Sequence, residues 1–267
     1  MSKYFQPDRR PAVVTGASSG IGAATALTLA AAGHPVALGA RRTDKCEEVA
    51  TQIRDSGGEA VVHALDITDG DSVDAFAKAV VADLGDVEVL ISNAGAVAPG
   101  TIHEVDTDRF ARELDLNIVG AHRLVRSFVP DMVARQRGDV VFVSSDVAVR
   151  ARPFMSSYAA GKWGLEGMAH AMQMELEGSG VRASIVRPGP TWSEMGTDWD
   201  VEQAAFVLNQ WVRFGMARHP HFMKPQAIAD AIAMVVRAPR GVHLNLIEVS
   251  PEAPIATTPI TEPVEGR

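Results

Sequence analysis

The chain reads AVVTGASSGIG at residues 12–22, and a stretch rich in Ala and Leu follows directly. A short run of β-branched and apolar residues, a glycine-rich turn and an Ala-rich stretch are typical of a strand that leads into a helix. Glycine permits a tight turn with positive φ and lets the backbone approach a pyrophosphate, which the free N–H groups at the start of the helix can bind. This segment therefore predicts a nucleotide-binding loop, with an ordinary turn between strand and helix as the alternative.

The same alternation of short β-branched runs and Ala-rich amphipathic stretches continues to about residue 190. It is the pattern of repeated βαβ units, whose right-handed crossovers place helices on both faces of one parallel sheet. We therefore expect an α/β fold, a Rossmann-like doubly wound parallel sheet of about seven strands with ligands at the carboxyl ends of the strands. The expected strands are 12–15, 35–40, 60–64, 87–92, 138–144, 182–187 and 244–249. The expected helices are 20–32, 43–56, 70–84, 106–135, 156–178 and 225–237.

One catalytic domain is expected over residues 12–249, between an N-terminal arm at 1–11 and a C-terminal tail at 250–267. The tail contains several prolines, which disfavour a helix or a central strand. Within the domain, residues 190–224 are rich in aromatic side chains with Gly and Pro breaks around them, and we interpret this segment as a small helical substrate lid. Its aromatic residues are Trp192, Trp199, Phe206, Trp211, Phe214 and Phe222.

Composition limits the kind of protein this can be. With 267 residues, of which 46% are apolar and 22% charged, the chain is long enough for one α/β domain with a sizeable core. The formal net charge of −8 argues against binding of nucleic acid or of an anionic membrane by bulk electrostatics. Cys46 is the only cysteine, which excludes an intrachain disulfide, and we find neither a signal peptide nor ~18 consecutive apolar residues. We therefore expect a soluble cytoplasmic protein.

The segment TGASSGIG at residues 15–22 resembles the TGxxxGxG motif of short-chain dehydrogenases/reductases rather than the GxGxxG motif of other Rossmann enzymes. Further matches to this family follow in order along the chain: Asp66, Asn93-Ala94-Gly95, Asn117, Ser145, Tyr158, Lys162 and Pro188-Gly189. The resemblance spans residues 12 to about 250. It implies an NAD(P)-dependent oxidoreductase that interconverts an alcohol and a ketone or aldehyde, assembled as a homodimer or homotetramer.

Tyr158 and Lys162 are four positions apart, so a helix would place both side chains on one face. A phenol with a pKa of about 10 is a poor acid or base at neutral pH, and a nearby cation lowers that pKa. The resemblance implies that Tyr158 exchanges a proton with the substrate oxygen, while Lys162 assists it and bonds the nicotinamide ribose. Taken as an isolated motif, the same pair would be a surface tyrosine and a solvated lysine.

Ser145 follows the apolar run 139–143, at the carboxyl end of an expected parallel strand, where active-site groups lie. Its hydroxyl can hold the substrate oxygen and stabilise developing charge. Ser144 is adjacent, and either serine fits a cap at the strand end, but the family spacing selects Ser145. Asn117 resembles the family's helix asparagine, which is thought to hold a water that links the lysine to solvent. Its alternative role is a cap at a kink in the helix.

The expected second strand ends at Ala40, and Arg41 and Arg42 follow it. In this fold the tip of that strand meets the adenosine ribose, where an acidic residue favours NAD and an arginine favours the 2′-phosphate of NADP. We therefore predict NADP(H), and NAD(H) as well if one arginine only caps the next helix or stacks on adenine. The resemblance assigns cofactor binding to Gly16, Ser18, Ser19, Gly20, Ile21, Gly22, Arg41, Arg42, Asp66, Ile67, Asn93, Ala94, Gly95, Tyr158, Lys162, Pro188, Gly189, Thr191 and Ser193.

Three further features leave alternatives open. The aromatic segment 190–224 fits either an apolar pocket for a bulky alcohol or ketone, or the ordinary core of a lid or subunit interface. Arg150 and Arg152 fit either contacts with an acidic substrate or solvated loop charges. His219 and His221 have no third ligand at metal spacing, so we expect surface histidines and no metal.

Two other functions compete with an oxidoreductase of free small molecules. A 3-oxoacyl-carrier reductase would need a basic rim for its acidic carrier, and only Arg150 and Arg152 offer one. A non-catalytic NADP-binding sensor or scaffold would not need Asn117, Ser145, Tyr158 and Lys162 together. Because this set is intact and the basic rim is small, we predict an enzyme that acts on a free alcohol or carbonyl compound.

Overall fold

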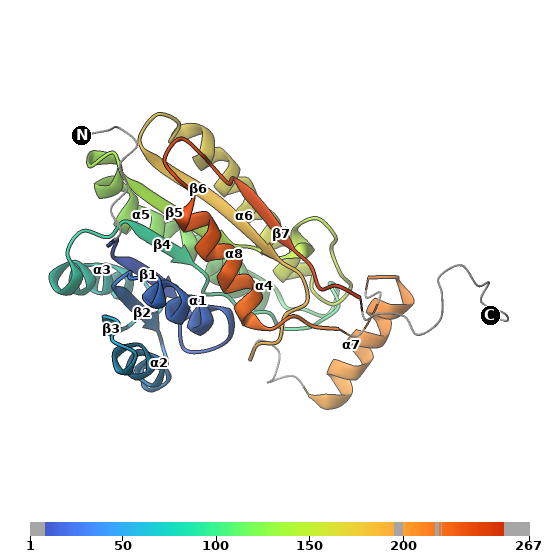
Figure 1. Ribbon diagram of the computed structural model, residues 1–267. Coiled ribbons are helices and arrows are strands. Elements are labelled where there is room, and N and C mark those ends of the chain that lie inside the picture. The colour runs from blue at the N-terminus through green and yellow to red at the C-terminus, as the bar shows by residue number, and fades with distance from the viewer. Residues whose placement is uncertain (1–8, 195–199, 217–218, 220, 254–267) are drawn as a thin grey trace, which may run out of the picture.

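The fold is built on one seven-stranded sheet, in which every neighbouring pair of strands is parallel. The computed structural model describes residues 9–194, 200–216, 219 and 221–253. Its strand order is β3-β2-β1-β4-β5-β6-β7, which confirms the expected doubly wound sheet (Figure 1). The strands are β1 (Ala12–Thr15), β2 (Val36–Ala40), β3 (Ala60–Ala64), β4 (Val89–Ser92), β5 (Gly138–Val143), β6 (Val181–Pro188) and β7 (Leu246–Val249).

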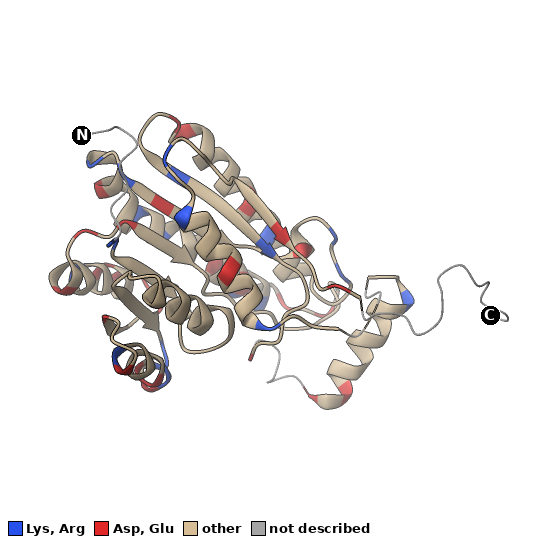
Figure 2. Cartoon of the chain, in the orientation of Figure 1, with Lys and Arg blue, Asp and Glu red and all other residues tan. Residues whose placement is uncertain are grey.

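Helices cover both faces of this sheet because the strand side chains alternate between the faces and are apolar on each. One apolar cluster contains Val14 and Leu38 and packs under α1, α2 and α8, and the other contains Val13 and Ala37 and packs under α3, α5 and α6. The helices are α1 (Gly20–Ala31), α2 (Thr43–Asp55), α3 (Gly70–Leu84), α4 (Thr107–Leu114), α5 (Gly120–Ala134), α6 (Ser156–Glu175), α7 (Val201–Arg213) and α8 (Pro225–Arg237). Acidic and basic residues are interspersed along these elements (Figure 2).

The long helix expected at 106–135 is interrupted, and this expectation was therefore wrong in detail. A π-helical turn, η1 (Asp115–Val119), separates α4 from α5. At its centre the Asn117 side chain donates to the carbonyl of Glu113 one turn earlier, at 2.9 Å, and so competes with the regular backbone ladder. Turns of this kind occur often at functional sites, and this one carries a predicted active-site residue.

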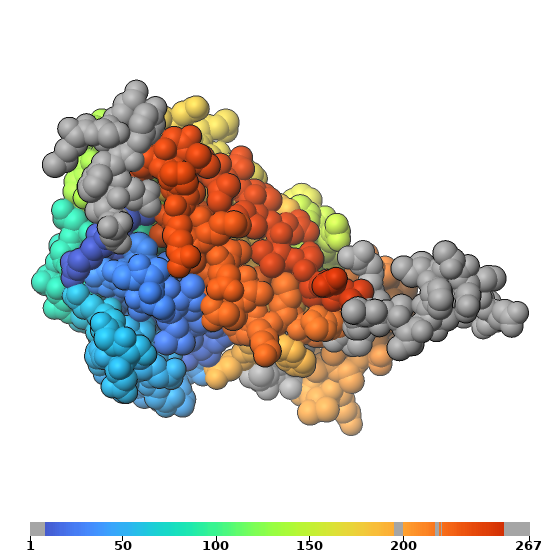
Figure 3. Space-filling model, viewed as in Figure 1, coloured from blue at the N-terminus to red at the C-terminus, as the bar shows by residue number. Residues whose placement is uncertain are grey.

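The segment 190–224 leaves the sheet and contains the helix α7, at one end of the molecule (Figures 1 and 3). Thr191, after β6, forms an isolated bridge with Met223, just before α8. Residues 195–199, including Trp199, lie outside the described part of the chain, as do most residues of the expected C-terminal tail.

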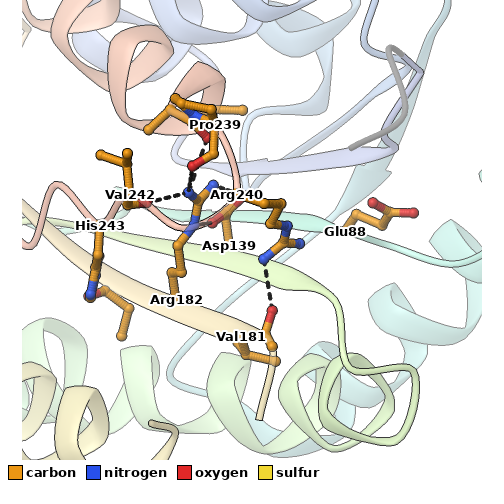
Figure 4. A network of polar contacts seen from close by, with 12 residues as sticks. Glu88, Asp139, Val181, Arg182, Pro239, Arg240, Val242 and His243 are labelled. Atoms are coloured by element: carbon orange, nitrogen blue, oxygen red, sulfur yellow. Dashed lines mark hydrogen bonds and ion pairs between the residues drawn. The ribbon is translucent and has the colours of Figure 1, made fainter. Parts of the chain in front are cut away.

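A network of buried ion pairs lies at the amino ends of the central strands, at the other end of the strands from the glycine loop (Figure 4). Asp139 in β5 is 2% exposed and accepts from Arg182 of β6 through Nε at 2.6 Å and Nη2 at 3.0 Å. Arg10 is fully buried, contacts the second oxygen of Asp139, and donates to Glu88 at 3.2 Å. Arg10 thus binds the segment before β1 to β5 and to the start of β4.

Candidate active site

The carboxyl ends of four central strands bring the predicted residues to one edge of the sheet. The glycine loop at 16–22 follows β1, Asn93 follows β4, Ser145 follows β5 and Gly189 follows β6. Strand order reverses between β1 and β4, and ligands of open α/β sheets bind outside the strands at such a point. The predicted cofactor and catalytic residues therefore share one region of the molecule.

The glycine loop has the bare backbone that a pyrophosphate requires. Gly16 and Gly20 have φ values of 65° and 55°, which favour glycine. A Cβ atom at Gly22 would lie 2.2 Å from the carbonyl oxygen of Gly16, so this position accepts no side chain. The loop is fastened to β4 by Asn93, whose Nδ2 donates to the carbonyl of Thr15 at 2.8 Å. This geometry fits a dinucleotide, whose phosphates the loop and the start of α1 would hold.

The two arginines after β2 lie differently. Arg41 is exposed and near Asp66, whose pKa is lowered mainly by hydrogen bonds from Thr68 and to a smaller extent by Arg41. The Nη2 atom of Arg42 donates to the hydroxyls of Ser18 and Ser19, at 3.0 and 3.1 Å, and so reaches the glycine loop. Although Arg42 is the N-cap residue of α2, its side chain makes no capping hydrogen bond there.

Arg42 also binds a carboxylate that the sequence analysis did not single out. The same Nη2 atom donates to Glu194 Oε2 at 2.7 Å, across the opening between the glycine loop and the segment after β6. The arginine hydrogen bonds hold the pKa of Glu194 below its usual range, with a further contribution from Ser19. The carboxylate of Glu194 therefore lies beside Arg42 and the loop serines, where the sequence predicts that a 2′-phosphate would bind.

Among the other predicted cofactor residues, Asp66 and Ile67 follow β3, and Ser193 lies beside the glycine loop. The side chain of Asp66 accepts from Thr68 N at 2.9 Å and thereby closes a turn before α3. Ile67 is buried and packs on the backbone of Gly120, where a Cβ atom would lie 2.7 Å from Ile67 Cδ1. Ser193 Cβ lies 3.1 Å from where a Cβ of Gly20 would be, so the segment after β6 covers the glycine loop.

Two other predicted cofactor residues, Thr191 and Gly189, are joined by a hydrogen bond: Thr191 Oγ1 donates to the Gly189 carbonyl at 2.9 Å. Pro188 ends β6, and Ile21 in the first turn of α1 packs on the apolar cluster under that helix. Ala94 N donates to Thr15 Oγ1 at 3.1 Å, which holds the turn after β4 against β1. All of these residues thus lie between the carboxyl ends of β1, β4 and β6.

The helix α6 carries Tyr158 and Lys162 into the interior beside Ser145. Tyr158 is 6% exposed and Lys162 is 3% exposed, and the Lys162 ammonium lies 5.6 Å from the centre of the Tyr158 ring. Lys162 Nζ donates to the carbonyl of Val143 at 2.9 Å, which joins α6 to the end of β5. The Ser145 hydroxyl donates to Asp146 Oδ1 at 3.3 Å and accepts from the N–H of Val147.

Burial, rather than the neighbouring lysine, has the largest effect on the pKa of Tyr158. Burial raises the pKa of Tyr158 to about 12, and a hydrogen bond with Ser145 acts in the opposite direction. Burial also lowers the pKa of Lys162 to about 8, and the charge of Glu166 acts against this change. Our expectation that Lys162 lowers the pKa of Tyr158 therefore does not hold here, because desolvation of the phenolate outweighs it. Tyr158 is a neutral phenol at pH 7.

Asn117 is buried next to the lysine. Its Nδ2 donates to the carbonyls of Ala96 and Glu113 at 3.0 and 2.9 Å, while its buried Oδ1 has no hydrogen-bond partner among the described residues. A Cβ atom at Gly95 would lie 2.8 Å from Asn117 Oδ1 and 3.6 Å from Lys162 Nζ. The asparagine and the lysine therefore border one point, and an unsatisfied buried acceptor there suits a hydrogen-bonding ligand or a proton path.

Arg152 is not a solvated loop charge, so that interpretation was wrong for this residue. Its side chain is 10% exposed, forms an ion pair with Asp146, and lies over the ring of Trp211 at 5.1 Å. Arg150, in contrast, is exposed. Asp146 follows Ser145 directly, and burial raises its pKa against the effect of Arg152. The sequence analysis missed this pair because burial of the loop depends on α7, which is distant in the chain.

Part of the aromatic segment forms a small core around the tyrosine. This core consists of Val97, Val147, Met155, Tyr158, Val207 and Trp211, with Phe154 packed against it. Phe154 meets Phe206 of α7 edge to face at 5.2 Å, and Phe206 is 52% exposed. Trp211 is thus part of the lid core, whereas Phe206 presents half of its surface beside the site.

Other ligand classes find little support in the described residues. His219 and His221 have ring centres 6.4 Å apart, and no group of three metal-binding side chains occurs in the part of the chain that the structure describes. Among the described helices, none is both long and apolar enough to span a membrane.

A glycine loop and a Ser-Tyr-Lys set at the carboxyl edge of a doubly wound parallel sheet define a dinucleotide-dependent oxidoreductase. The family model for short chain dehydrogenases matches residues 10–204, and this chain belongs to that family. It is an NAD(P)-dependent oxidoreductase that acts on CH–OH groups.

Three known proteins illustrate the similarity. The chain is 35% identical to glycine betaine reductase ATRR of Emericella nidulans over 241 residues, which are 90% of this chain and 18% of that protein. It is 36% identical to the putative ketoacyl reductase of the monensin polyketide synthase of Streptomyces virginiae, over 69% of this chain and 71% of that protein. The structure of an alcohol dehydrogenase from Thermococcus sibiricus with 5-hydroxy-NADP aligns with a TM-score of 0.78 at 29% identity, covering 90% and 96% of the two chains.

Proposed function

We propose that this enzyme interconverts a free alcohol and the corresponding ketone or aldehyde, with Tyr158 as general acid and base. The observation that carries the proposal is the burial of Tyr158, Lys162 and Ser145 together at the edge that holds the glycine loop. A surface tyrosine and a solvated lysine would not be 6% and 3% exposed. A nicotinamide bound by the loop residues would supply or accept the hydride.

The residues then divide the remaining work. In the direction of reduction, the neutral phenol of Tyr158 donates its proton to the substrate oxygen, which the hydroxyl of Ser145 helps to hold. The Lys162 ammonium, 5.6 Å from the centre of the phenol ring, stabilises the phenolate that remains. The Oδ1 atom of Asn117 lies beside Lys162 and is a free hydrogen-bond acceptor among the described residues, so it can take part in a path that returns a proton to Tyr158. In oxidation the phenolate form of Tyr158 takes the proton from the substrate hydroxyl, and the Lys162 ammonium favours that form.

The test is turnover by the purified protein with NADPH or NADH over a panel of carbonyl compounds, from bulky apolar ketones to short keto acids, measured by nicotinamide absorbance. Turnover of some member supports the proposal, and the preferred member identifies the substrate class. Tight binding of NADPH without turnover of any member would favour a sensor or scaffold instead.

We further propose that NADP(H) is the preferred cofactor. The contacts of Arg42 support this proposal, because its guanidinium and the neighbouring Ser18 and Ser19 hydroxyls already surround an anion, the carboxylate of Glu194. Replacement of Arg42 by Ala is expected to raise the Kd for NADPH about 10- to 100-fold, since a hydrogen bond to a charged group contributes about 1.5–3 kcal/mol. The Kd for NADH should change little, and fluorescence titration of both nucleotides measures this.

The matched control is Arg126→Ala, at an exposed arginine of α5, on the other face of the sheet. It should leave both affinities unchanged. Equal losses for NADPH and NADH in Arg42→Ala would contradict the proposal and would assign Arg42 to stacking on adenine.

Glu194 is expected to weaken the binding of NADP(H). Its carboxylate accepts from Arg42 at 2.7 Å, so a 2′-phosphate must displace or repel it. Replacement of Glu194 by Gln should therefore lower the Kd for NADPH by about 3- to 10-fold without changing the Kd for NADH. Isothermal titration calorimetry at low salt would measure both constants, and weaker NADPH binding in the variant would refute this role.

The core around Tyr158 supports a substrate with a compact apolar body. Val97, Val147 and Trp211 surround the phenol ring, and the arginine in this region, Arg152, is already neutralised by Asp146. A 3-oxoacyl-carrier reductase is the second candidate, favoured by the similarity to the monensin ketoacyl reductase. Against it, the basic rim is reduced to the exposed Arg150. Comparison of a 3-oxoacyl thioester with free ketones as substrates separates the two.

We also propose a homodimer or homotetramer. Large apolar side chains that are exposed on α6 support this, since isolated subunits seldom expose such groups together: Trp163 is 55% and Met174 73% exposed. Light scattering on the purified protein would give the number of subunits.

A further inference from the structure

A buried carboxylate lies one helical turn beyond the proposed catalytic lysine. Glu166 is 6% exposed, and both of its oxygens are bound. Oε1 accepts from the Ser144 hydroxyl at 2.6 Å and from Arg187 Nε at 3.0 Å, and Oε2 accepts from Arg187 Nη2 at 2.7 Å. A buried carboxylate is costly unless its hydrogen bonds are complete, and here they are complete in one fixed geometry.

The two partners of Glu166 come from the ends of two strands, one beside the proposed catalytic serine and one beside the proposed nicotinamide contacts. Ser144 immediately precedes Ser145 at the end of β5, and Arg187 immediately precedes Pro188 and the proposed nicotinamide contacts at the end of β6. Glu166 itself lies on α6 with Tyr158 and Lys162. A single side chain therefore joins the ends of β5 and β6 to α6, and the bond from Lys162 to Val143 reinforces one of these two connections.

Glu166 also acts on the charge of Lys162. Among the described groups, Glu166 is the charge that favours the ammonium of Lys162, whose pKa burial lowers to about 8. Charged and titratable groups lie on the elements that adjoin this pair. Arg187 comes from β6, and Glu248 of β7 lies 2.8 Å from it. Asp146 follows β5, Tyr158 and His170 lie on α6, and the buried Glu113 of α4 accepts from Ser157 of α6 at 2.6 Å. Of these, Arg187 is bonded to Glu166, so the carboxylate stays ionised while it faces the lysine.

We propose that Glu166 is a positioning residue: it holds the ends of β5 and β6 against α6 around the reacting centre and keeps Lys162 in its charged form. This inference rests on the roles proposed above for Ser145, Tyr158 and Lys162. Glu166 has no contact with the reacting groups themselves and acts through Ser144, Arg187 and Lys162.

The first test is the pH dependence of kcat in Glu166→Gln. Glutamine keeps the shape and one carbonyl acceptor, but it removes the charge that favours the ammonium, so Lys162 loses its proton at a lower pH. The basic limb of the kcat profile should therefore move to lower pH. The ratio of the kcat of the variant to that of the native chain is expected to be about ten times smaller at about pH 8 than at about pH 6. The pH dependence of the Kd for NADPH should move in the same direction, because Lys162 is proposed to bond the ribose.

Two further variants separate the effect of the hydrogen bonds of Glu166 from the effect of its charge. Ser144→Ala removes one hydrogen bond to Glu166 and leaves its charge, so it should lower kcat about 3- to 10-fold without moving the basic limb. Glu175→Gln removes an exposed carboxylate from the same helix and should change neither quantity. If Glu166→Gln fails to fold, Glu166→Gln with Arg187→Gln removes both charges, avoids an unpaired arginine and should show the same shift.

The outcomes are distinguishable. An unchanged kcat profile in folded Glu166→Gln, whether or not its Tm falls, would overturn the inference and leave Glu166 a structural residue. Lys162→Ala tests the proposed function itself: if this variant retains full activity, the proposed mechanism fails first. If Lys162→Ala is inactive and Glu166→Gln shows no shift, only the inference on Glu166 fails.

Discussion

Replacement of Tyr158 by Phe is expected to lower kcat by about 10²–10⁴-fold, because the variant loses the only group proposed to exchange a proton with the substrate oxygen. The ring stays in place: Tyr158 is 6% exposed and packs with Val147 and Trp211, and phenylalanine preserves those contacts. Steady-state kinetics with the preferred carbonyl compound and NADPH measure the effect. Because burial raises the pKa of Tyr158 to about 12, the phenol remains a proton donor throughout the neutral range.

The same variant supplies its own control. Its Kd for NADPH and its Tm should lie close to the native values, since only a hydroxyl group is removed. Retention of more than about a tenth of kcat would show that another acid serves the reaction. Asp146 would then be the first group to examine, because burial raises its pKa and Ser145 donates to it.

Replacement of Asp139 by Ala is expected to lower the free energy of unfolding by about 3–5 kcal/mol, because removal of one partner leaves buried charges uncompensated. Asp139 is 2% exposed and binds both Arg10 and Arg182. The guanidinium of Arg10 is fully buried and would keep only Glu88 as an acidic partner. Urea unfolding at a fixed protein concentration, followed by far-UV circular dichroism, measures the change.

Asp83→Ala is the matched control for Asp139. Asp83 pairs with His63 at the surface, where its side chain is 46% exposed, and removal of an exposed pair should cost less than about 1 kcal/mol. A loss below about 1 kcal/mol in Asp139→Ala would mean that Glu88 and water compensate the arginines. The network would then contribute to the specificity of the fold more than to its stability.

Local patterns predicted most of the architecture. The strands expected at 12–15 and 60–64 agree with β1 and β3 residue for residue, because short apolar runs between turn residues mark strands clearly, both in the buried β1 and in the half-buried edge strand β3. The spacing of four residues predicted that Tyr158 and Lys162 share one face of a helix, but their assignment to a site came from the family resemblance. The expected helix at 106–135 did not include the interruption at Asp115–Val119, and a kink there was only the alternative role of Asn117, because periodicity does not reveal the side-chain bond that Asn117 makes.

Contacts between distant segments decided the remaining features of the site. Arg42 was predicted to bind a phosphate, but its bond with Glu194, 152 positions away, required the segment after β6 to cover the glycine loop. Arg152 read as a loop charge, and only packing against Trp211 of α7 removed it from solvent. A one-dimensional pattern cannot contain such pairings, because their energy arises from side chains that meet only after folding.

The sequence by itself determined the fold class, the glycine loop, the identity of the catalytic residues that we propose, and an arginine suited to a 2′-phosphate. The fold class, the loop and the arginine follow from residue type and short spacing, which act through local backbone geometry, whereas the resemblance to the family assigned the catalytic residues. The tertiary structure alone decided how acidic those groups are and what holds them. Burial raises the pKa of Tyr158 and lowers that of Lys162, and the Glu166 network joins three elements around them, because desolvation depends on everything that packs around a charge.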